Sequence, residues 1–193
     1  MRVDRGFEPL ATERLLLRRS HPDDAEAISA YRSDPEVRRN QGWARTDAAW
    51  IRAEIEQMAA RAPGEPGWVQ FSVEERAGGR LVGDVGLCPA DGEPGVIKVG
   101  YTMAPHVQGR GYATEAVRAL TDYAFDRLGA GVVRAYASAD NVASVRVAEK
   151  VGLRLVERIE HREGPERWVG VRYELAREDR PGRSGLRDRP GRG

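Results

Sequence analysis

Gln108-Gly109-Arg110-Gly111-Tyr112-Ala113 joins a strand expected at 96–103 to a long helix expected from Ala113 onward. Apolar residues that recur every three or four positions indicate this helix, namely Ala113, Ala116, Val117, Leu120, Ala124 and Leu128. The first turn of a helix presents backbone N–H groups that have no partner inside the helix. These groups and the helix dipole attract phosphate, and glycine lets the backbone approach it closely. The junction is therefore a candidate phosphate-binding turn.

Two better-known phosphate-binding patterns do not fit this turn. It lacks the Gly-Lys-Ser/Thr ending of the Walker loop and the third glycine of the dinucleotide fingerprint. Taken alone, two glycines before a helix fit an ordinary structural turn equally well.

Strands and helices alternate on both sides of this junction. Apolar runs bounded by turn residues indicate strands at 15–17, 68–75, 81–87, 96–103, 132–137, 153–160 and 168–175. A first helix is expected from Ser20, which could cap this helix, to Asp34-Pro35. Three further helices are expected over 47–61, with Thr46 as the cap, over 113–128 and over 142–151. This order predicts a mixed α/β fold in one domain.

Composition separates a folded body from a short tail. The chain has 193 residues, 40% of them hydrophobic, and a formal net charge of +1 from 31 basic and 30 acidic side chains. This balance suits a globular domain and argues against nucleic acid as a partner. Residues 177–193 hold six arginines but only three acidic residues. We expect one domain over 1–176 and a disordered arginine-rich tail over 177–193.

Cysteine usage and hydropathy indicate a cytoplasmic protein. Cys88 is the one cysteine, so the chain can form neither an internal disulfide nor a CxxC metal or redox site. The first ten residues contain no apolar stretch of signal length, and no uncharged run reaches the ~18 residues of a membrane span. We therefore expect no membrane partner and a reducing cytosol.

The junction resembles motif A of the GNAT superfamily of N-acetyltransferases. That motif reads Gln/Arg-x-x-Gly-x-Gly/Ala, and Gln108, Gly111 and Ala113 match it position by position. Downstream, Asn141-x-x-Ser144 and residues 149–152 resemble motif B of the branch typified by ribosomal-protein N-terminal (alanine/serine) acetyltransferases. Residues 12–18, Thr-Glu-Arg-Leu-Leu-Leu-Arg, resemble the opening of that branch, so the likeness covers roughly 12–175.

The resemblance implies a fold, a co-substrate and a set of binding residues. The fold would be a mixed, mostly antiparallel sheet that splays between the strands at 96–103 and 132–137, with about four helices. Acetyl-CoA would be the co-substrate, and no metal is implied. The residues expected to bind it are Met103, Gln108, Gly109, Arg110, Gly111, Tyr112, Ala113, Thr114 and Asn141.

Ser144 is the catalytic residue that the resemblance implies. Many relatives place a tyrosine seven residues after the motif-B asparagine to protonate the leaving thiolate, but Ala148 stands at that position. In the ribosomal-protein branch a serine at the position of Ser144 takes this role, by hydrogen-bonding the departing sulfur and relaying a proton. Helix capping is the alternative role for both Asn141 and Ser144.

The general base and the acceptor contacts stay open at this level. Lys98 stands where relatives often carry a glutamate, so Asp84, Glu157, Glu160 or a chain of waters are the alternatives. Trp43 is expected to line the entrance of the acceptor site.

The implied activity is transfer of an acetyl group from acetyl-CoA to a primary amine by direct attack in a ternary complex. The acceptor would be a protein N-terminus or a small-molecule amine, and the enzyme a monomer or a homodimer. Two other functions stay open: an acyl-CoA-binding sensor or scaffold with weakened activity, and a ribosome- or RNA-associated module that uses the arginine-rich tail.

Overall fold

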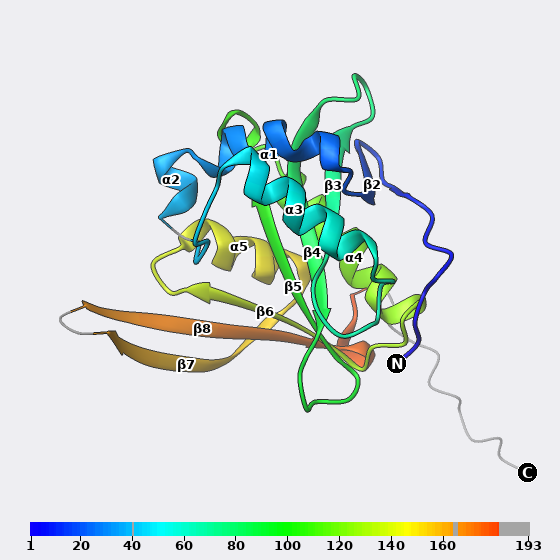
Figure 1. Ribbon diagram of the computed structural model, residues 1–193. Coiled ribbons are helices and arrows are strands. Elements are labelled where there is room, and N and C mark those ends of the chain that lie inside the picture. Colours follow the sequence, from blue (N-terminus) through cyan, green and yellow to red (C-terminus); the bar gives the residue numbers. More distant parts are fainter. Residues whose placement is uncertain (40, 164–165, 182–193) are drawn as a thin grey trace, which may run out of the picture.

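A computed structural model describes residues 1–39, 41–163 and 166–181, which form one eight-stranded sheet with helices on both faces (Figure 1). Its strands are β1 (Leu10–Ala11), β2 (Leu15–Arg19), β3 (Val69–Glu75), β4 (Leu81–Pro89), β5 (Val96–Met103), β6 (Val132–Ser138), β7 (Arg154–Glu163) and β8 (Glu166–Ala176). The α-helices of this described part are α1 (Ala25–Arg32), α2 (Pro35–Arg38), α3 (Ala48–Ala59), α4 (Tyr112–Asp126) and α5 (Val142–Val151). Single turns of 3₁₀ helix occupy Pro22–Asp24, Pro105–Val107 and Arg177–Asp179.

The sheet is mixed and mostly antiparallel, as predicted. Its strand order is β1-β2-β3-β4-β5-β6-β8-β7, and β5–β6 is the one parallel pair among the described strands. Side chains alternate between the two faces of a strand, so Tyr101 and Thr102 of β5 point to opposite faces. Tyr101 contacts α5, whereas Asp84, which is paired with Thr102, contacts α1. Helices α1 and α5 therefore pack on opposite faces.

Helix α4 fills the core on its face of the sheet. The apolar spacing predicted for it is confirmed, because Ala116, Leu120 and Ala124 have no exposed surface and Phe125 beside them is also fully buried. The helix packs against β2, β4, β5 and β6, and residues 104–111 join its N-terminus to the end of β5.

Two predicted helix caps are wrong by one residue. Helix α3 is capped by Asp47, which accepts the Trp50 N–H at 3.0 Å, rather than by Thr46. The first helical turn is capped by His21, whose Nδ1 accepts the Asp23 N–H at 3.3 Å, rather than by Ser20. Asp34-Pro35 ends α1 as expected but then starts the single-turn helix α2, since Asp34 accepts the Glu36 N–H at 2.9 Å.

The described chain continues past Ala176, where the sequence placed the start of the tail. Arg177 donates from Nε to the carbonyl of Ala130 at 2.9 Å and from a terminal nitrogen to the carbonyl of Phe125. Arg180 pairs with Asp122 at 2.9 Å and with Asp126 at 2.7 Å. Residues 177–181 thus lie against the C-terminal end of α4. The remainder of the predicted tail, residues 182–193, lies outside the described residues.

We expect residues 177–181 to stabilise the domain. The free energy of unfolding should be about 1–3 kcal/mol lower for a chain that ends at Ala176 than for one that ends at Pro181, because the shorter chain loses the part-buried contacts of Arg177 and Arg180. Urea denaturation of the two truncated chains measures this difference directly. Equal stability would show that the contacts on α4 contribute nothing.

Candidate active site

The junction between β5 and α4 is a tight turn built on two glycines. Gly109 and Gly111 have φ angles of 76° and 82°, in the left-handed region where a side chain would be strained. Gly111 is the N-cap of α4, and no side chain in the described part of the protein caps the helix. The first bond inside the helix runs from the Glu115 N–H to the Gly111 carbonyl at 3.1 Å, so the amides of residues 112–114 precede it. This geometry suits an anion at the helix N-terminus.

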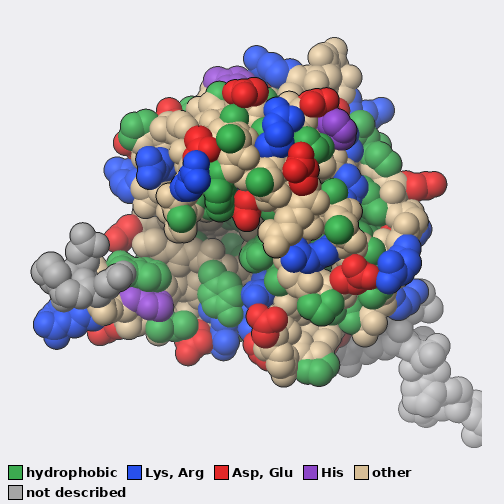
Figure 2. All heavy atoms as spheres, viewed as in Figure 1, with side chains coloured by type: hydrophobic (Ala, Val, Ile, Leu, Met, Phe, Trp, Pro, Cys, Tyr) green, Lys and Arg blue, Asp and Glu red, His purple; other side chains and the backbone are tan. Residues whose placement is uncertain are grey.

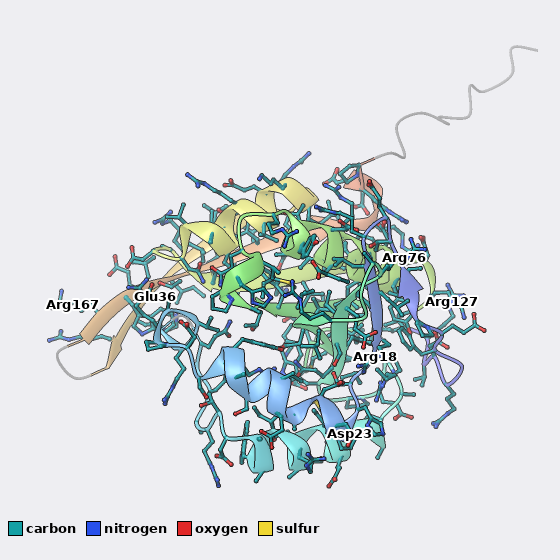
Figure 3. The ribbon with its side chains drawn as sticks, turned by 90° about the horizontal axis from the view of Figure 1, so that it is seen from above. Arg18, Asp23, Glu36, Arg76, Arg127 and Arg167 are labelled. Carbon is teal, nitrogen blue, oxygen red and sulfur yellow. The ribbon has the colours of Figure 1, made fainter. Side chains whose placement is uncertain are left out.

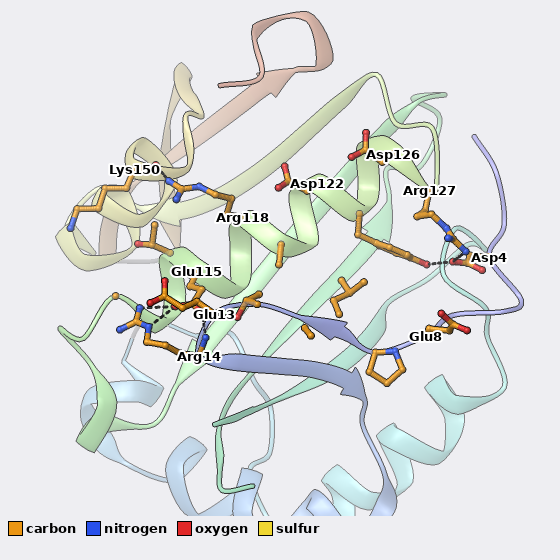
Figure 4. Close-up of a pocket in the computed structure, with 18 residues that line it drawn as sticks. Asp4, Glu8, Glu13, Arg14, Glu115, Arg118, Asp122, Asp126, Arg127 and Lys150 are labelled. Atoms are coloured by element: carbon orange, nitrogen blue, oxygen red, sulfur yellow. Dashed lines mark hydrogen bonds and ion pairs between the residues drawn. The ribbon is translucent and has the colours of Figure 1, made fainter. Parts of the chain in front are cut away.

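An ion pair holds this turn from the N-terminal segment of the chain. The Glu115 carboxylate accepts hydrogen bonds from Arg14 Nε at 2.7 Å, the Arg14 N–H at 2.8 Å and Thr12 Oγ1 at 2.5 Å (Figure 4). Arg14 also donates to the Arg110 carbonyl at 2.9 Å, and its guanidinium lies 4.7 Å from the centre of the Tyr112 ring. Residues 12–18 therefore support the glycine turn. The sequence identified this segment as a motif but did not show this role.

Hydrogen bonding also sets the charge of Glu115. Burial raises its pKa, but the hydrogen bonds from Thr12 and Arg14 outweigh burial, so the pKa lies below its ordinary value. Glu115 therefore carries a full negative charge at neutral pH and attracts the guanidinium of Arg14.

Strands β5 and β6 separate beside this turn. They pair from Val96–Val132 to Val99–Ala135, after which β5 continues along β4 as far as Met103 and β6 continues along β8. Since the Ala104 N–H donates to Val82 on β4 at 2.9 Å, the alternation of a strand directs the backbone groups of Tyr101 and Met103 away from β4. These groups face the opening, where Gln108 Nε2 donates to the Met103 carbonyl at 3.1 Å.

A cavity of about 410 Å³ occupies the opening and brings most of the predicted site together. The predicted residues that line it are Met103, Gln108, Gly109, Gly111, Tyr112, Ala113, Thr114, Asn141 and Ser144. Its lining also includes residues that the sequence did not single out as site residues, among them Glu36, Val37 and Gln41. Helix α2 and the loop after it therefore contribute to this cavity.

Asn141 and Ser144 meet at the start of α5. Asn141 Oδ1 accepts the Ser144 N–H at 3.1 Å, so the alternative capping role of Asn141 is present in the structure. Ser144 Oγ lies 2.8 Å from the Tyr101 hydroxyl, which also donates to the Ser144 carbonyl at 2.9 Å. Burial raises the pKa of Tyr101 to about 12, although the hydrogen bond with Ser144 acts in the opposite direction. Tyr101 thus keeps its proton at neutral pH.

Two predicted site residues lie outside the lining of this cavity. The Arg110 guanidinium lies 5.1 Å from the centre of the Tyr112 ring and 3.8 Å from Glu75. Trp43 is half-buried, and the guanidinium of Arg32 lies over its ring at 4.4 Å. Both side chains are therefore directed by a neighbouring ring or charge, which a linear pattern does not show.

Asp84 is buried in a network of hydrogen bonds. Its carboxylate accepts from Arg32 Nη2 at 2.9 Å, from the Tyr31 hydroxyl and from the Gln70 amide. Burial, and then the charge of Asp84, raise the pKa of Tyr31 well above its ordinary value. Three donors already occupy the carboxylate, and two of them, Tyr31 and Arg32, connect α1 to β4.

The remaining candidate bases are Glu157 and Glu160, and Lys98 stands where relatives often carry a glutamate. Lys98 Nζ lies 3.7 Å from Asp91, on the half-buried part of β5. Glu157 pairs with Arg172 at 3.1 Å, and Glu160 is exposed.

A second groove, of about 880 Å³, runs between the N-terminal segment and α4 (Figure 4). It shares Gly111, Thr114 and Lys150 with the first cavity, so the two are continuous at the N-terminus of α4. At this end Arg118 donates to the Lys150 carbonyl at 2.7 Å, and both residues line the groove. Its far end is lined by the carboxylates of Asp4, Glu8, Asp122 and Asp126.

Two kinds of feature are absent from the described residues. Within residues 1–39, 41–163 and 166–181, no group of three or more His, Cys, Asp or Glu side chains is placed to hold a metal ion. None of the described helices is both long and apolar enough to cross a membrane.

Comparisons with known proteins agree on one kind of domain. A family model described as an acetyltransferase (GNAT) domain matches residues 14–154. The uncharacterized N-acetyltransferase p20 of Bacillus licheniformis is 32% identical over 142 residues, which are 73% of this chain and 79% of that protein.

Solved structures with the same fold include two acetyltransferases. The crystal structure of a GNAT-family acetyltransferase from Bacillus anthracis has a TM-score of 0.78 and 26% identity, covering 89% of this chain and 99% of that one. RimJ of Mycobacterium smegmatis, in complex with CoA-disulfide, has a TM-score of 0.76 and covers 86% of this chain and 84% of its own. At 21% identity that second likeness concerns the fold alone. The predicted fold class is confirmed.

The Arg14–Glu115 pair should make stability depend on pH in a defined direction. Because the pKa of Glu115 is lower in the folded than in the unfolded chain, its contribution is present above the unfolded pKa and is lost as pH falls through the folded pKa. Glu115→Gln should lower the free energy of unfolding by about 2 kcal/mol at pH 7. This difference from wild type should shrink as the pH falls from 5 to 3.

Glu13→Gln is the matched control, because Glu13 is a neighbouring but exposed glutamate. Urea denaturation at a series of pH values measures both variants. A Glu115→Gln deficit that stays constant down to pH 3 would mean that packing rather than charge explains it.

Proposed function

We propose, since the chain belongs to the acetyltransferase (GNAT) domain family, that it moves an acetyl group from acetyl-CoA to a primary amine by direct attack in a ternary complex. The observation that carries this proposal is the opening between β5 and β6, which exposes strand backbone next to the N-terminus of α4. Acetyl-CoA supplies the thioester whose carbonyl carbon takes the amine and whose sulfur leaves.

The glycine turn is suited to hold the pyrophosphate of CoA. The amides of residues 112–114 precede the first helical bond, and Gly109 and Gly111 add no side chain that would keep a phosphate at a distance. Arg118 and Lys150 lie at the mouth of the adjoining groove, where they would meet further phosphate charge. Contacts with Tyr112 and Glu75 hold the Arg110 side chain beside the turn and outside the cavity lining.

The free edge of β5 is suited to hold the pantetheine arm. A strand edge with unpaired N–H and C=O groups accepts an extended amide chain as it would accept another strand. In this role the groups of Tyr101 and Met103 bind the arm, and an N–H on the same edge polarises the reacting carbonyl. Asn141 caps α5 through Oδ1, which leaves its amide NH₂ available to donate to the pantetheine arm.

Ser144 and Tyr101 are suited to return a proton to the leaving sulfur. Ser144 Oγ lies in the cavity lining and is hydrogen-bonded to the Tyr101 hydroxyl at 2.8 Å, while Tyr101, which is protonated at neutral pH, donates to the Ser144 carbonyl at 2.9 Å. The pair offers a hydroxyl relay even though Ala148 stands where many relatives carry tyrosine. This supports transfer over the alternative of a CoA-binding sensor without activity.

The acceptor must reach the site as a neutral amine. Asp84 is occupied by three donors, so we assign it no proton transfer, and water is the simplest base. An α-amine has a pKa near 8 and is already partly neutral at physiological pH, which favours a protein N-terminus or an amine of similar pKa. The likeness of residues 12–18 and 141–152 to ribosomal-protein N-terminal acetyltransferases agrees with this class of acceptor. Trp43 stays a prediction for the acceptor entrance.

Gly111→Val tests the pyrophosphate site. The side chain strains the left-handed turn and obstructs close approach, so the Kd for CoA measured by calorimetry should rise at least about tenfold. Gly129→Val is a closely matched control at the other end of α4. Its φ is 71°, and a Cβ there also comes within 3.4 Å of an arginine side chain, as at Gly111. Both variants should lose similar stability, and equal CoA affinity in both would place the pyrophosphate elsewhere.

Ser144→Ala tests the activity and the proton relay together. In a screen of acetyl transfer to amines and short peptides, kcat should fall by about 100-fold while KM for acetyl-CoA stays within about twofold. Tyr101→Phe should show a smaller loss, since Ser144 keeps its own hydroxyl. Full turnover of Ser144→Ala when chemistry limits the rate would remove the serine from the mechanism. Failure of wild type to bind acetyl-CoA would overturn the proposed function.

A further inference from the structure

Trp68 is a large apolar residue that stays exposed beside the opening. It immediately precedes β3 and leaves 42% of its surface accessible. Its six-membered ring lies over two glycines: a Cβ on Gly86 would lie 3.2 Å from Cε3, and a Cβ on Gly100 would lie 3.5 Å from Cη2. Gly86 and Gly100 are direct partners across β4 and β5. The paired glycines form a flat shelf of backbone on which the indole rests.

The shelf lies where β5 and β6 separate. Gly100 follows Val99, the last residue of β5 that pairs with β6. By the alternation of a strand, Gly100 shares a face with Thr102 and is opposite to Tyr101, which holds Ser144. Thr102 lines the 410 Å³ cavity and is two residues, about 7 Å, further along the strand. Trp68 therefore borders the opening on the face opposite to the Tyr101–Ser144 pair.

This face of the sheet is open beyond β4. Helices α1 and α3 pack on β4 and β3, while Tyr136 of β6 leaves 52% of its surface exposed. Figure 2 shows the molecule hollowed between the helices and the β7–β8 hairpin, with hydrophobic side chains in the hollow. In the view from above, Glu36 of α2 and Arg167 of β8 lie at the same end of the molecule (Figure 3). Trp68 and Tyr136 are both partly exposed on this face, where an acceptor can reach the indole.

Two cations on this face of β5 and β6 are already paired. Arg134, on the same face as Lys98, binds Glu93 at 2.6 Å and Glu174 at 2.7 Å. Lys98 lies 3.7 Å from Asp91. Recognition at this position therefore depends on the aromatic surface more than on net charge.

We propose that Trp68 determines acceptor specificity and selects amines that carry an aromatic ring close to the amine nitrogen. This inference rests on the proposed function and concerns its acceptor site. The acceptor ring stacks on the outer face of the indole while its amine reaches the opening beside Gly100. Offset and edge-to-face contacts favour an aromatic ring over a saturated ring of equal size. A small amine and a protein N-terminus that begins with an aromatic residue share this chemistry.

The test compares acceptors that differ in aromaticity. Wild type and Trp68→Ala, as full-length chains, are assayed at saturating acetyl-CoA with benzylamine and with cyclohexylmethylamine. A second arm uses tetrapeptides that begin with phenylalanine or with cyclohexylalanine, which separates a small-molecule acceptor from a protein N-terminus. Wild type should prefer the aromatic member of at least one pair by about tenfold in kcat/KM. Trp68→Ala should lose this preference through a higher acceptor KM, with an unchanged KM for acetyl-CoA.

Trp168→Ala is the matched control. Trp168 is equally exposed, at 43%, but its ring stacks on His161 at 3.8 Å on the hairpin and not on the glycine shelf. This variant should keep the aromatic preference, and Trp68→Phe should keep part of it. Loss of the fold would lower kcat/KM equally for both acceptors of a pair, so the ratio of the two kcat/KM values separates specificity from stability.

The outcomes separate the two proposals. Acetyl transfer without an aromatic preference in wild type, or a preference that survives in Trp68→Ala, overturns the specificity inference alone. A preference lost equally in Trp168→Ala also overturns it. Absence of transfer to every acceptor overturns the proposed function and this inference with it.

Discussion

The separation of β5 from β6 after Val99 and Ala135 is the constraint on which the site depends. A sheet that splits leaves strand backbone without partners, and such groups are costly unless they are satisfied. Gln108 satisfies the Met103 carbonyl, and the Tyr101 hydroxyl bridges to Ser144 on the helix that follows β6. The separation of the two strands also creates the cavity between the N-terminus of α4 and the free edge of β5.

Arginines hold α4 at both ends, and this explains part of an arginine-rich composition. Arg14 binds Glu115 in the first turn, while Arg177 and Arg180 bind the carbonyls and carboxylates of the last turns. A planar guanidinium with several donors suits carbonyl and carboxylate partners that lie in different directions. Segments near both ends of the described chain thus converge on the helix that begins at the glycine turn. The position of that turn depends on contacts made almost a hundred residues away in sequence.

Much of the fold and the binding turn could be predicted from local pattern. The period of α4, the left-handed glycines at 109 and 111 and the alternation of β5 are local properties, so spacing along the chain reveals them. Most of the residues assigned to the cavity are within a few positions of these elements. Arg110 and Trp43 lie outside the cavity lining, where Tyr112 and Glu75 contact Arg110 and Arg32 lies over the ring of Trp43, so their roles stay predictions.

The sequence by itself determined the order of elements, the glycine turn at the start of α4 and the family resemblance of its motifs. Only the tertiary structure decided that Glu115 would hold Arg14 and Thr12, that Tyr101 would meet Ser144, and that Trp68 would rest on Gly86 and Gly100. The physical reason is the range of the interactions. Helix periodicity and glycine conformation act over a few residues, whereas an ion pair, a shared hydroxyl or a ring on a sheet depends on strand register and helix docking between distant segments.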